Sequence, residues 1–148
     1  MLRISKLTDY AIMVMGALSE TPGTIMSAQV LADATHLELP TVSKVLKLLG
    51  RAGLVHSFRG KHGGYSAERP ADSISVAEII AAIDGPIAMT ECSIETGLCS
   101  QEQVCNLRGN WQRISSAVAR AIEGVSLAEM TRPARINRPA LNIATLNA

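Results

Sequence analysis

Apolar residues recur at intervals of three and four through the first part of the chain, which is the spacing of amphipathic helices. The first helix is expected to run from Thr8 to the turn signal at 21–23, where threonine, proline and glycine follow one another. Its apolar stripe consists of Tyr10, Ala11, Val14, Met15 and Leu18. A shorter helix is expected over 27–35, starting from a serine suited to an N-cap and burying Val30 and Leu31.

A third helix is expected to open with Pro40, because proline is favourable at a first helical position, and to end near Gly53. Its buried stripe consists of Val42, Val45, Leu46 and Leu49. Its outer face is polar and basic, and consists of Thr41, Ser43, Lys44, Lys47 and Arg51. Two short helices in tight succession, the second with a basic outer face, have the geometry of a helix-turn-helix.

A β-hairpin is expected directly after this helix. Residues 54–58 and 65–68 are predicted strands, and the glycine-rich residues 59–64 between them are the predicted turn. The tip of the hairpin is basic, with Arg59, Lys61 and His62. From Lys44 to Arg69 there are six lysines and arginines and one acidic residue. The pattern therefore predicts a DNA-binding wing beside a recognition helix.

The following segment, 73–86, predicts another helix. Ser75 and Glu78 have the spacing of a capping box, and the helix is expected to end at the sequence Asp84–Gly85–Pro86. Its apolar stripe consists of Val76, Ile79, Ile80 and Ile83.

A longer helix is expected over 107–125, where apolar positions alternate in steps of four and three. This heptad-like seam consists of Leu107, Trp111, Ile114, Val118, Ala121 and Val125. A helix of roughly 28 Å would overhang a domain of about eighty residues, so the seam is expected to pack against a second copy rather than against its own domain. Such a twofold dimer also suits a palindromic operator. Residues 129–148 have no hydrophobic periodicity and are expected to form a disordered tail.

Composition supports a mostly helical protein, because 47% of the residues are hydrophobic but only 3% are aromatic. The net charge of +1 hides an asymmetry: residues 1–70 carry eight Lys or Arg and five Asp or Glu, a net of +3. A basic front half indicates an anionic partner. No apolar run approaches a membrane span of roughly 18–20 residues, so a cytoplasmic protein is expected. No catalytic constellation or small-molecule substrate site is recognisable, so an enzyme is not expected.

All three cysteines of the chain, Cys92, Cys99 and Cys105, lie within fourteen positions. Structural zinc usually takes four ligands from closely spaced pairs, so zinc is disfavoured. Iron-sulfur clusters accept thiolates at irregular spacing and a fourth ligand other than cysteine. An odd number of cysteines also argues against a disulfide framework. The spacing therefore favours cluster ligands and leaves open a thiol-disulfide switch and inert packing.

The chain resembles the Rrf-type family of winged-helix transcription regulators, which includes IscR and NsrR. The resemblance rests on the opening LRISKLTDY, the wing RGKHGGY, the helix end AEIIAAIDGP and the three-cysteine segment before a long helix. It extends from Met1 to about Val125, and within the family the opening is most similar to regulators of SUF iron-sulfur assembly operons.

The resemblance implies that Cys92, Cys99 and Cys105 are cluster ligands. IscR-like members have a histidine ligand three residues after the last cysteine, where this chain has Arg108, which cannot ligate iron. NsrR-like members take a carboxylate from the first helix of the partner subunit, and the matching residue here is Asp9. A 2Fe-2S cluster is favoured over a 4Fe-4S cluster. The resemblance also implies that Arg59 enters the minor groove.

The expected protein is mostly α, a homodimeric winged helix-turn-helix repressor that binds double-stranded operator DNA under the control of an iron-sulfur cluster. Its regulated genes are expected to be iron-sulfur assembly or stress genes. The alternatives are a thiol-disulfide regulator of the same fold and, less favoured, an iron-sulfur carrier. The expected units are a DNA-binding domain at 1–86, a cluster loop at 87–106, a dimerisation helix at 107–128 and a tail at 129–148. The expected DNA contacts are Ser27, Pro40, Thr41, Ser43, Lys44, Lys47, Arg51, Arg59, Lys61 and His62.

Overall fold

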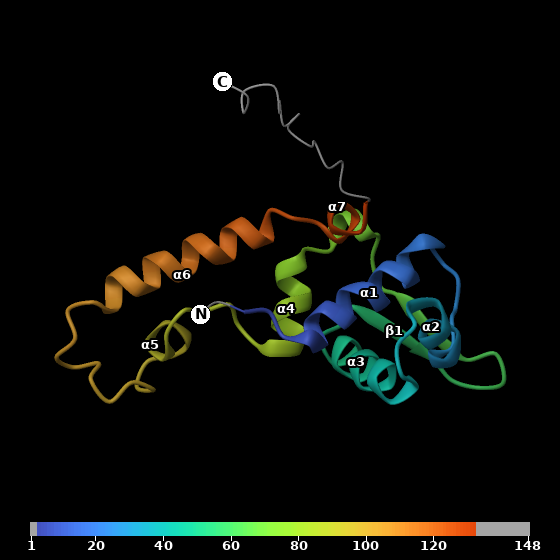
Figure 1. Ribbon diagram of the computed structural model, residues 1–148, viewed down its shortest axis with the longest axis horizontal. Coiled ribbons are helices and arrows are strands. Elements are labelled where there is room, and N and C mark those ends of the chain that lie inside the picture. The colour runs from blue at the N-terminus through green and yellow to red at the C-terminus, as the bar shows by residue number, and fades with distance from the viewer. Residues whose placement is uncertain (1–2, 133–148) are drawn as a thin grey trace, which may run out of the picture.

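The computed structural model describes residues 3–132, which form seven α-helices, one short 3-10 helix and one antiparallel hairpin (Figure 1). In chain order these are α1 (Lys6–Glu20), α2 (Ala28–Thr35), α3 (Leu39–Arg51), β1 (Val55–Phe58), β2 (Gly64–Ala67), η1 (Ala71–Ser73), α4 (Val76–Asp84), α5 (Glu91–Ile94), α6 (Arg108–Glu123) and α7 (Leu127–Thr131). The mostly helical winged helix-turn-helix expected from the sequence is confirmed.

The core lies where α1 meets α3 and α4. The predicted stripes of α1 and α3 are buried apart from Tyr10, which is only half-buried. Five residues are fully removed from solvent: Val14, Met15, Val42, Val45 and Leu49. In α4 the capping box between Ser75 and Glu78 forms as predicted, and the helix ends at Asp84. Ile83, expected on the buried stripe, is only half-buried because it lies in the last turn, where α4 leaves the core.

Helix α2 differs from the prediction at one position. Its N-cap is Ser27, as expected, but Val30 is 49% exposed, so its predicted burial is wrong. The helix turns Leu31, Ala32 and Thr35 inward instead, because these residues share one face at spacings of one, three and four.

The hairpin is fixed to the helical domain at Gly64. A side chain on Gly64 would meet the Met26 backbone oxygen at 2.6 Å, whereas one on Gly63 would meet the Phe58 backbone oxygen within the hairpin itself. The close approach at Gly64 allows Met26 and Tyr65 to exchange two backbone hydrogen bonds of 2.9 and 2.8 Å. The wing therefore has a set position relative to the start of α2.

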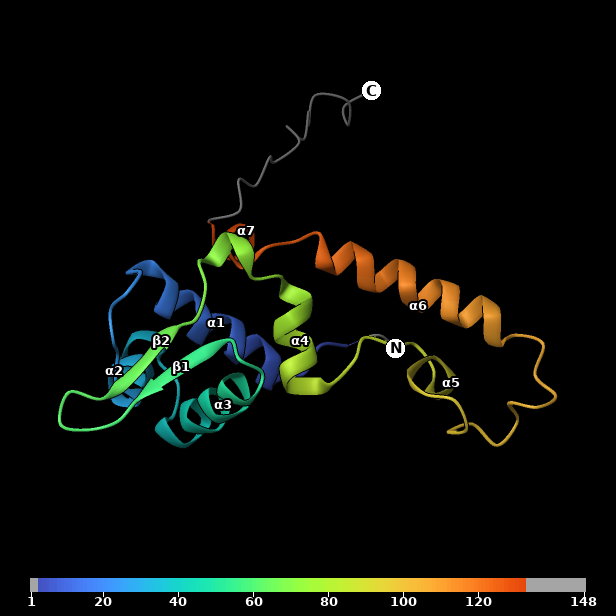
Figure 2. The same cartoon turned by 180° about the vertical axis from the view of Figure 1, so that it is seen from behind.

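Helices α5 and α6 form an arm that projects from the winged domain (Figures 1 and 2). The arm, defined here as residues 85–124, contains all three cysteines. The prediction of a wholly irregular cysteine loop is wrong for residues 91–94, which form one helical turn. Helix α6 has sixteen residues rather than the nineteen expected: it starts after Leu107 and ends at Glu123, with Gly124 as its C-cap. Val125 then pairs with Val76 through a backbone hydrogen bond of 2.9 Å.

The chain returns to the winged domain after the arm. Leu127 donates a backbone hydrogen bond of 2.8 Å to Ile74 and is fully buried, and α7 packs on α1. The expectation of a disordered tail from residue 129 is therefore wrong for 129–131, where a second capping box, between Ser126 and Glu129, starts the helix. Residues 133–148, the rest of that expected tail, lie outside the described residues.

No helix within residues 3–132 is both long enough and apolar enough to span a membrane.

Candidate DNA interface and cysteine loop

The exposed face of α3 carries the polar residues expected to meet DNA. Pro40, Ser43, Lys44, Lys47 and Arg51 are exposed, and Thr41 is half-buried. This face exists because Val42, Val45, Leu46 and Leu49 all turn to the core, which leaves the intervening polar positions outside. Pro40 lies one residue inside the helix, which begins at Leu39.

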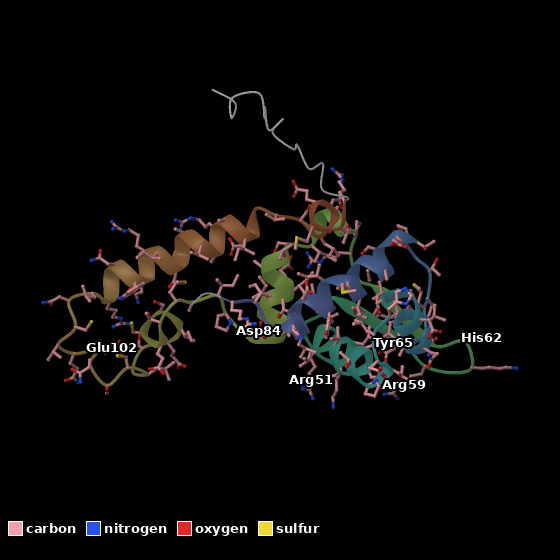
Figure 3. The ribbon with its side chains drawn as sticks, viewed as in Figure 1. Arg51, Arg59, His62, Tyr65, Asp84 and Glu102 are labelled. Atoms are coloured by element: carbon pink, nitrogen blue, oxygen red, sulfur yellow. The ribbon has the colours of Figure 1, made fainter. Side chains whose placement is uncertain are left out.

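The tip of the hairpin presents Arg59, Lys61 and His62, all of them exposed. In Figure 3, Arg51 and Arg59 lie along the same edge of the molecule, and His62 lies at the end of the hairpin. The hairpin is stiffened at β1, where the His56 and Phe58 rings stack edge to face at 4.7 Å and His56 Nδ1 lies 3.5 Å from a Glu68 carboxylate oxygen. The structure therefore brings the predicted basic helix face and basic turn to one side.

A cavity of about 610 Å³ separates α3 from the hairpin. Its lining includes Ser43, Lys47 and Arg51 from the helix, and Ser57 and Tyr65 from the strands. Ser57 and Tyr65 face each other in the strand register and were missed by the sequence reasoning. The position of Tyr65 directly after the two wing glycines was the signal available for it. Their hydroxyl groups extend the set of polar groups available to a DNA backbone.

The remaining predicted DNA contact, Ser27, is exposed but already has a structural role. Its hydroxyl oxygen accepts a hydrogen bond of 3.2 Å from the Val30 backbone as the N-cap of α2. His36, another exposed histidine, ends the same helix in a left-handed conformation, with φ of 55°. Ser27 therefore fixes the start of α2, and His36 shapes the turn between α2 and α3.

The three cysteines are free thiols that occupy different settings in the arm. Cys92 is buried in α5, where the Thr90 hydroxyl lies 3.2 Å from its sulfur. Cys99 and Cys105 are half-buried in the loop that follows. Among residues 3–132, no three side chains of the His, Cys, Asp and Glu types lie close enough together to hold a metal ion. The arm thus carries three free thiols that do not lie together at one site.

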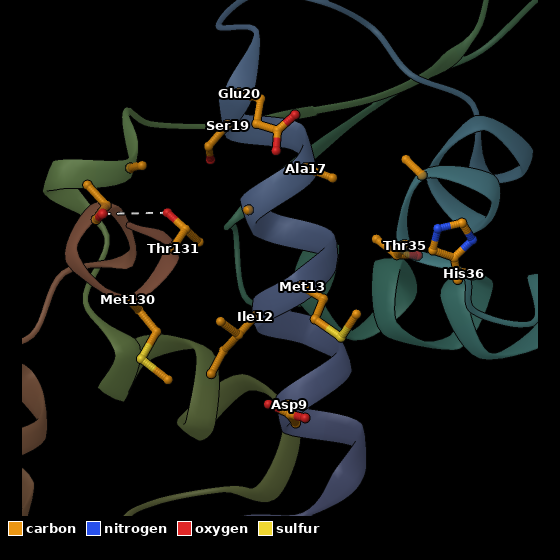
Figure 4. Close-up of a pocket in the computed structure, with 14 residues that line it drawn as sticks. Asp9, Ile12, Met13, Ala17, Ser19, Glu20, Thr35, His36, Met130 and Thr131 are labelled. Atoms are coloured by element: carbon orange, nitrogen blue, oxygen red, sulfur yellow. Dashed lines mark hydrogen bonds between the residues drawn. The ribbon is translucent and has the colours of Figure 1, made fainter. Parts of the chain in front are cut away.

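Asp9 lies apart from the loop, in the first turn of α1. It is exposed and stands at one end of a groove of about 670 Å³ that follows α1 (Figure 4). The end of α2 lines one side of this groove, and Met130 and Thr131 of α7 line the other. The Asp9 carboxylate is therefore accessible from outside the chain.

The hydrophobic seam of α6 is only partly covered within the described chain. Leu107, Trp111 and Ile114 are 58%, 37% and 42% exposed, and Val118 is half-buried. The helix instead turns Ser115 inward, where its hydroxyl accepts a hydrogen bond of 3.0 Å from the Met89 backbone.

The arm is tied to the winged domain where it begins. Asp84, at the end of α4, accepts hydrogen bonds from the Thr8 hydroxyl at 2.8 Å and the Ser5 backbone at 3.3 Å (Figure 3). Burial acts to raise the pKa of Asp84, but the hydrogen bonds from Ser5 and Thr8 outweigh it, so its pKa lies below the ordinary 3.8. A similar balance lowers the pKa of Glu78, mainly through the Ser75 backbone hydrogen bond, with Arg69 adding to it against burial.

Replacing Asp84 with Asn should lower the free energy of unfolding at pH 7 by roughly 0.5–1 kcal/mol, a modest loss because the carboxylate is exposed. The asparagine oxygen can still accept the Thr8 hydrogen bond, so the change removes the charge alone. Because the folded pKa is depressed, this stabilisation is complete well above 3.8 and is lost as the pH falls through the folded pKa. Urea unfolding at pH 7 and pH 3 measures the difference, and exposed Asp72→Asn is the control. A deficit that is equally large at pH 3 would contradict a role for the charge.

Comparison with known proteins places this arrangement in a family. The family model described as "Rrf2: Iron-dependent Transcriptional regulator" matches residues 4–133. The chain belongs to the Rrf2 family. It is therefore a DNA-binding regulator of transcription rather than an enzyme.

Individual relatives agree with this assignment. The regulator IscR of Xenorhabdus nematophila is 28% identical over 145 residues, which cover 97% of this chain and 85% of that protein. The structure of CymR, the global cysteine regulator of B. subtilis, matches with a TM-score of 0.67 and 28% identity over 88% of this chain and 96% of that one. The structure of T. potens IscR matches with a TM-score of 0.62 and 25% identity, covering 87% and 85%.

Proposed function

We propose that this Rrf2-family regulator is a homodimeric repressor whose affinity for operator DNA is set by an iron-sulfur cluster, held by Cys92, Cys99 and Cys105. Its regulated genes would be those of SUF-type iron-sulfur assembly or of stress responses. The observation that carries the proposal is the placement of every cysteine on an arm that is joined to the DNA-binding domain at both ends. Similarity to IscR over nearly the whole chain supports the same reading.

The donor chemistry of the arm fits an iron-sulfur cluster. Three free thiols stand on one short segment, and thiolate is the preferred ligand of iron in such clusters. Among the described residues the three cysteine side chains do not lie together at one site, so the loop must rearrange to bind a cluster. When bound, the cluster would supply sensitivity to iron, oxygen or redox state, and a 2Fe-2S form is favoured.

The chain's own residues supply the connection between the arm and the DNA interface. At the start of the arm, Asp84 caps α1 through Ser5 and Thr8. At its end, residues 125–127 pair with 74–76, next to the start of α4. A rearranged arm therefore acts on α1 and α4, two of the three helices that pack against α3. A coupling free energy of about 1–3 kcal/mol would change operator affinity roughly 5- to 150-fold, which is enough for a switch.

In a dimer, the cluster site of one chain would be coupled to the DNA-binding domain of the other. The uncovered seam of α6 is a surface for a second copy, and a twofold dimer would present two recognition helices to a palindromic operator. The groove beside α1 leaves Asp9 accessible to such a partner, so its carboxylate could complete the partner's cluster as the fourth ligand.

The absorption spectrum of anaerobically isolated protein tests the cluster itself. Wild type is expected to show iron-sulfur charge-transfer bands, and Cys92→Ala, Cys99→Ala and Cys105→Ala are expected to lose them. The second candidate is a thiol-disulfide regulator. It would be established if the wild-type protein is colourless and if its operator binding changes reversibly when a thiol oxidant is added and then removed by reduction. That candidate is supported by the same three free cysteines.

Mixing variant subunits tests the fourth ligand. If ligands come from both chains, a heterodimer of Asp9→Ala and Cys92→Ala subunits keeps one intact site and should hold about half the normal cluster load. The intact site has its aspartate from one chain and its cysteines from the other. A full, equally stable cluster with an unchanged spectrum in Asp9→Ala homodimers would rule out Asp9 and leave a loop glutamate or solvent as fourth ligand.

A further inference from the structure

The cysteine loop contains an ion pair that closes it on itself. The Arg108 guanidinium, in the first turn of α6, pairs with the Glu102 carboxylate and donates a hydrogen bond of 2.9 Å to the Thr96 hydroxyl. The other Glu102 oxygen accepts a hydrogen bond from the Gly97 backbone. Three points of the loop are thereby joined through one carboxylate and one guanidinium.

This pair is more buried than the other ion pairs described. The side chain of Glu102 is only 10% exposed and that of Arg108 is 31% exposed. In the pair between Arg69 and Glu78, by contrast, both side chains are about 40% exposed, at 39% and 42%. A carboxylate so removed from water depends on its partner, since a buried charge left unpaired is strongly unfavourable. The pair is therefore more than an incidental surface contact.

The contacts divide the loop into two closed halves. The bond from Gly97 to Glu102 closes the half that contains Cys99, and the pair between Glu102 and Arg108 closes the half that contains Cys105. With both halves closed, the three thiols are not gathered at a common point.

We propose that the Glu102–Arg108 pair is a latch that holds the cluster-free loop closed with its thiols apart. The inference rests on the proposed function in that the cluster is the ligand opposed by the latch. To bring Cys99 and Cys105 around one centre with Cys92, the two halves of the loop must move, and this motion breaks or remakes the contacts of Glu102. The latch therefore lowers the affinity of the loop for a cluster, because its contacts must be broken on binding. In the cluster-bound protein, the Glu102 carboxylate and the Arg108 guanidinium are no longer paired.

The first test uses cluster-free protein and needs no cofactor. Hydrogen exchange of the Gly97 amide, followed by NMR, reports the latch directly because this amide donates to Glu102. Glu102→Ala and Arg108→Gln are expected to speed its exchange roughly tenfold, since a charged hydrogen bond is worth about 1.4 kcal/mol or more. Arg108→Lys keeps the charge but lacks the planar fork, so it should restore only part of the protection.

The matched control is Glu95→Ala, which removes an exposed glutamate from the same arm but touches neither Arg108 nor Gly97. It should leave the Gly97 exchange rate at the wild-type value. The melting temperatures of the cluster-free variants report whether their fold is intact. Wild-type exchange at Gly97 in folded Arg108→Gln would overturn the latch.

The second test determines whether the Glu102–Arg108 pair opposes or supports the cluster-bound loop. Reconstituted Glu102→Gln is expected to retain its cluster several-fold longer than wild type during challenge with an iron chelator, because its cluster-free loop has lost the latch. Faster cluster loss in Glu102→Gln than in Glu95→Gln would show that the pair supports the loaded loop, and would overturn the proposal. If wild type takes up no cluster, the proposed function fails, while the Gly97 exchange result still decides whether the pair fastens the loop.

Discussion

A chain carrying Ile114→Glu and Val118→Glu is expected to sediment as a monomer and to bind operator DNA weakly. Ile114 is 42% exposed and Val118 half-buried on the seam of α6, and the described elements leave much of this face open. Burying like charges across a helix-helix interface costs several kcal/mol, more than a dimer seam of this size recovers. Loss of the dimer removes one of the two recognition helices, so affinity for a palindromic operator should fall by orders of magnitude.

The matched control places the same two charges on the opposite side of the helix. Gln112 and Ser116 are exposed and lie one turn apart, away from the seam, so Gln112→Glu with Ser116→Glu should remain dimeric. Sedimentation velocity distinguishes the two variants. If the Ile114 and Val118 variant still sediments as a dimer, the interface lies elsewhere on the molecule.

Replacing Arg59 with alanine is expected to weaken operator binding by about 1–3 kcal/mol, or roughly 5- to 150-fold, with little change in fold stability. Arg59 is exposed at the first position of the hairpin turn, and the backbone bridge between Met26 and Tyr65 fixes the hairpin close to that turn. In the proposed complex, α3 would occupy the major groove, and a wing held in this way would present the guanidinium to the narrow, negative minor groove beside it. Fluorescence anisotropy at physiological salt measures the loss.

Two further variants separate this contact from general electrostatics. Lys47→Ala should weaken binding to all sequences and flatten the salt dependence by about one unit per lost phosphate contact. Arg113→Ala removes the same charge from α6, far along the chain from the winged domain, and should leave affinity nearly unchanged. If Arg59→Ala binds the operator as tightly as wild type, Arg59 of the wing does not contribute to the DNA interface.

The order and type of the helices in the winged domain could be predicted because their signals are local. Ser27 and the Ser75–Glu78 pair cap helices through hydrogen bonds within three residues, and Pro40 is compatible with a helix start. The hairpin follows from its glycines, which allow backbone approaches that a side chain would block. The basic outer face of α3 follows from the same periodicity that buries Val42, Val45, Leu46 and Leu49.

The candidate site was predictable in its chemistry but only partly in its geometry. The exposed basic residues of α3 and the wing could be named from the sequence, whereas Ser57 and Tyr65 join them only because the hairpin packs across from that helix. The three cysteines were equally evident as a set, but their spacing says nothing of the distances between their sulfurs. Those distances depend on where α5 and α6 hold the ends of the loop.

Tertiary packing alone decided how the parts are joined. The pairing of residues 125–127 with 74–76 and the hydrogen bonds of Asp84 to Ser5 and Thr8 link positions some fifty to eighty residues apart. Val30 is exposed, although hydrophobic, because Leu31, Ala32 and Thr35 fill the contact between α2 and the core. Sequence patterns record which face of an element is apolar, since that is a property of neighbouring residues. Which element packs against that face depends on competition among contacts between residues far apart in the chain. The result of that competition can be seen only in the folded structure.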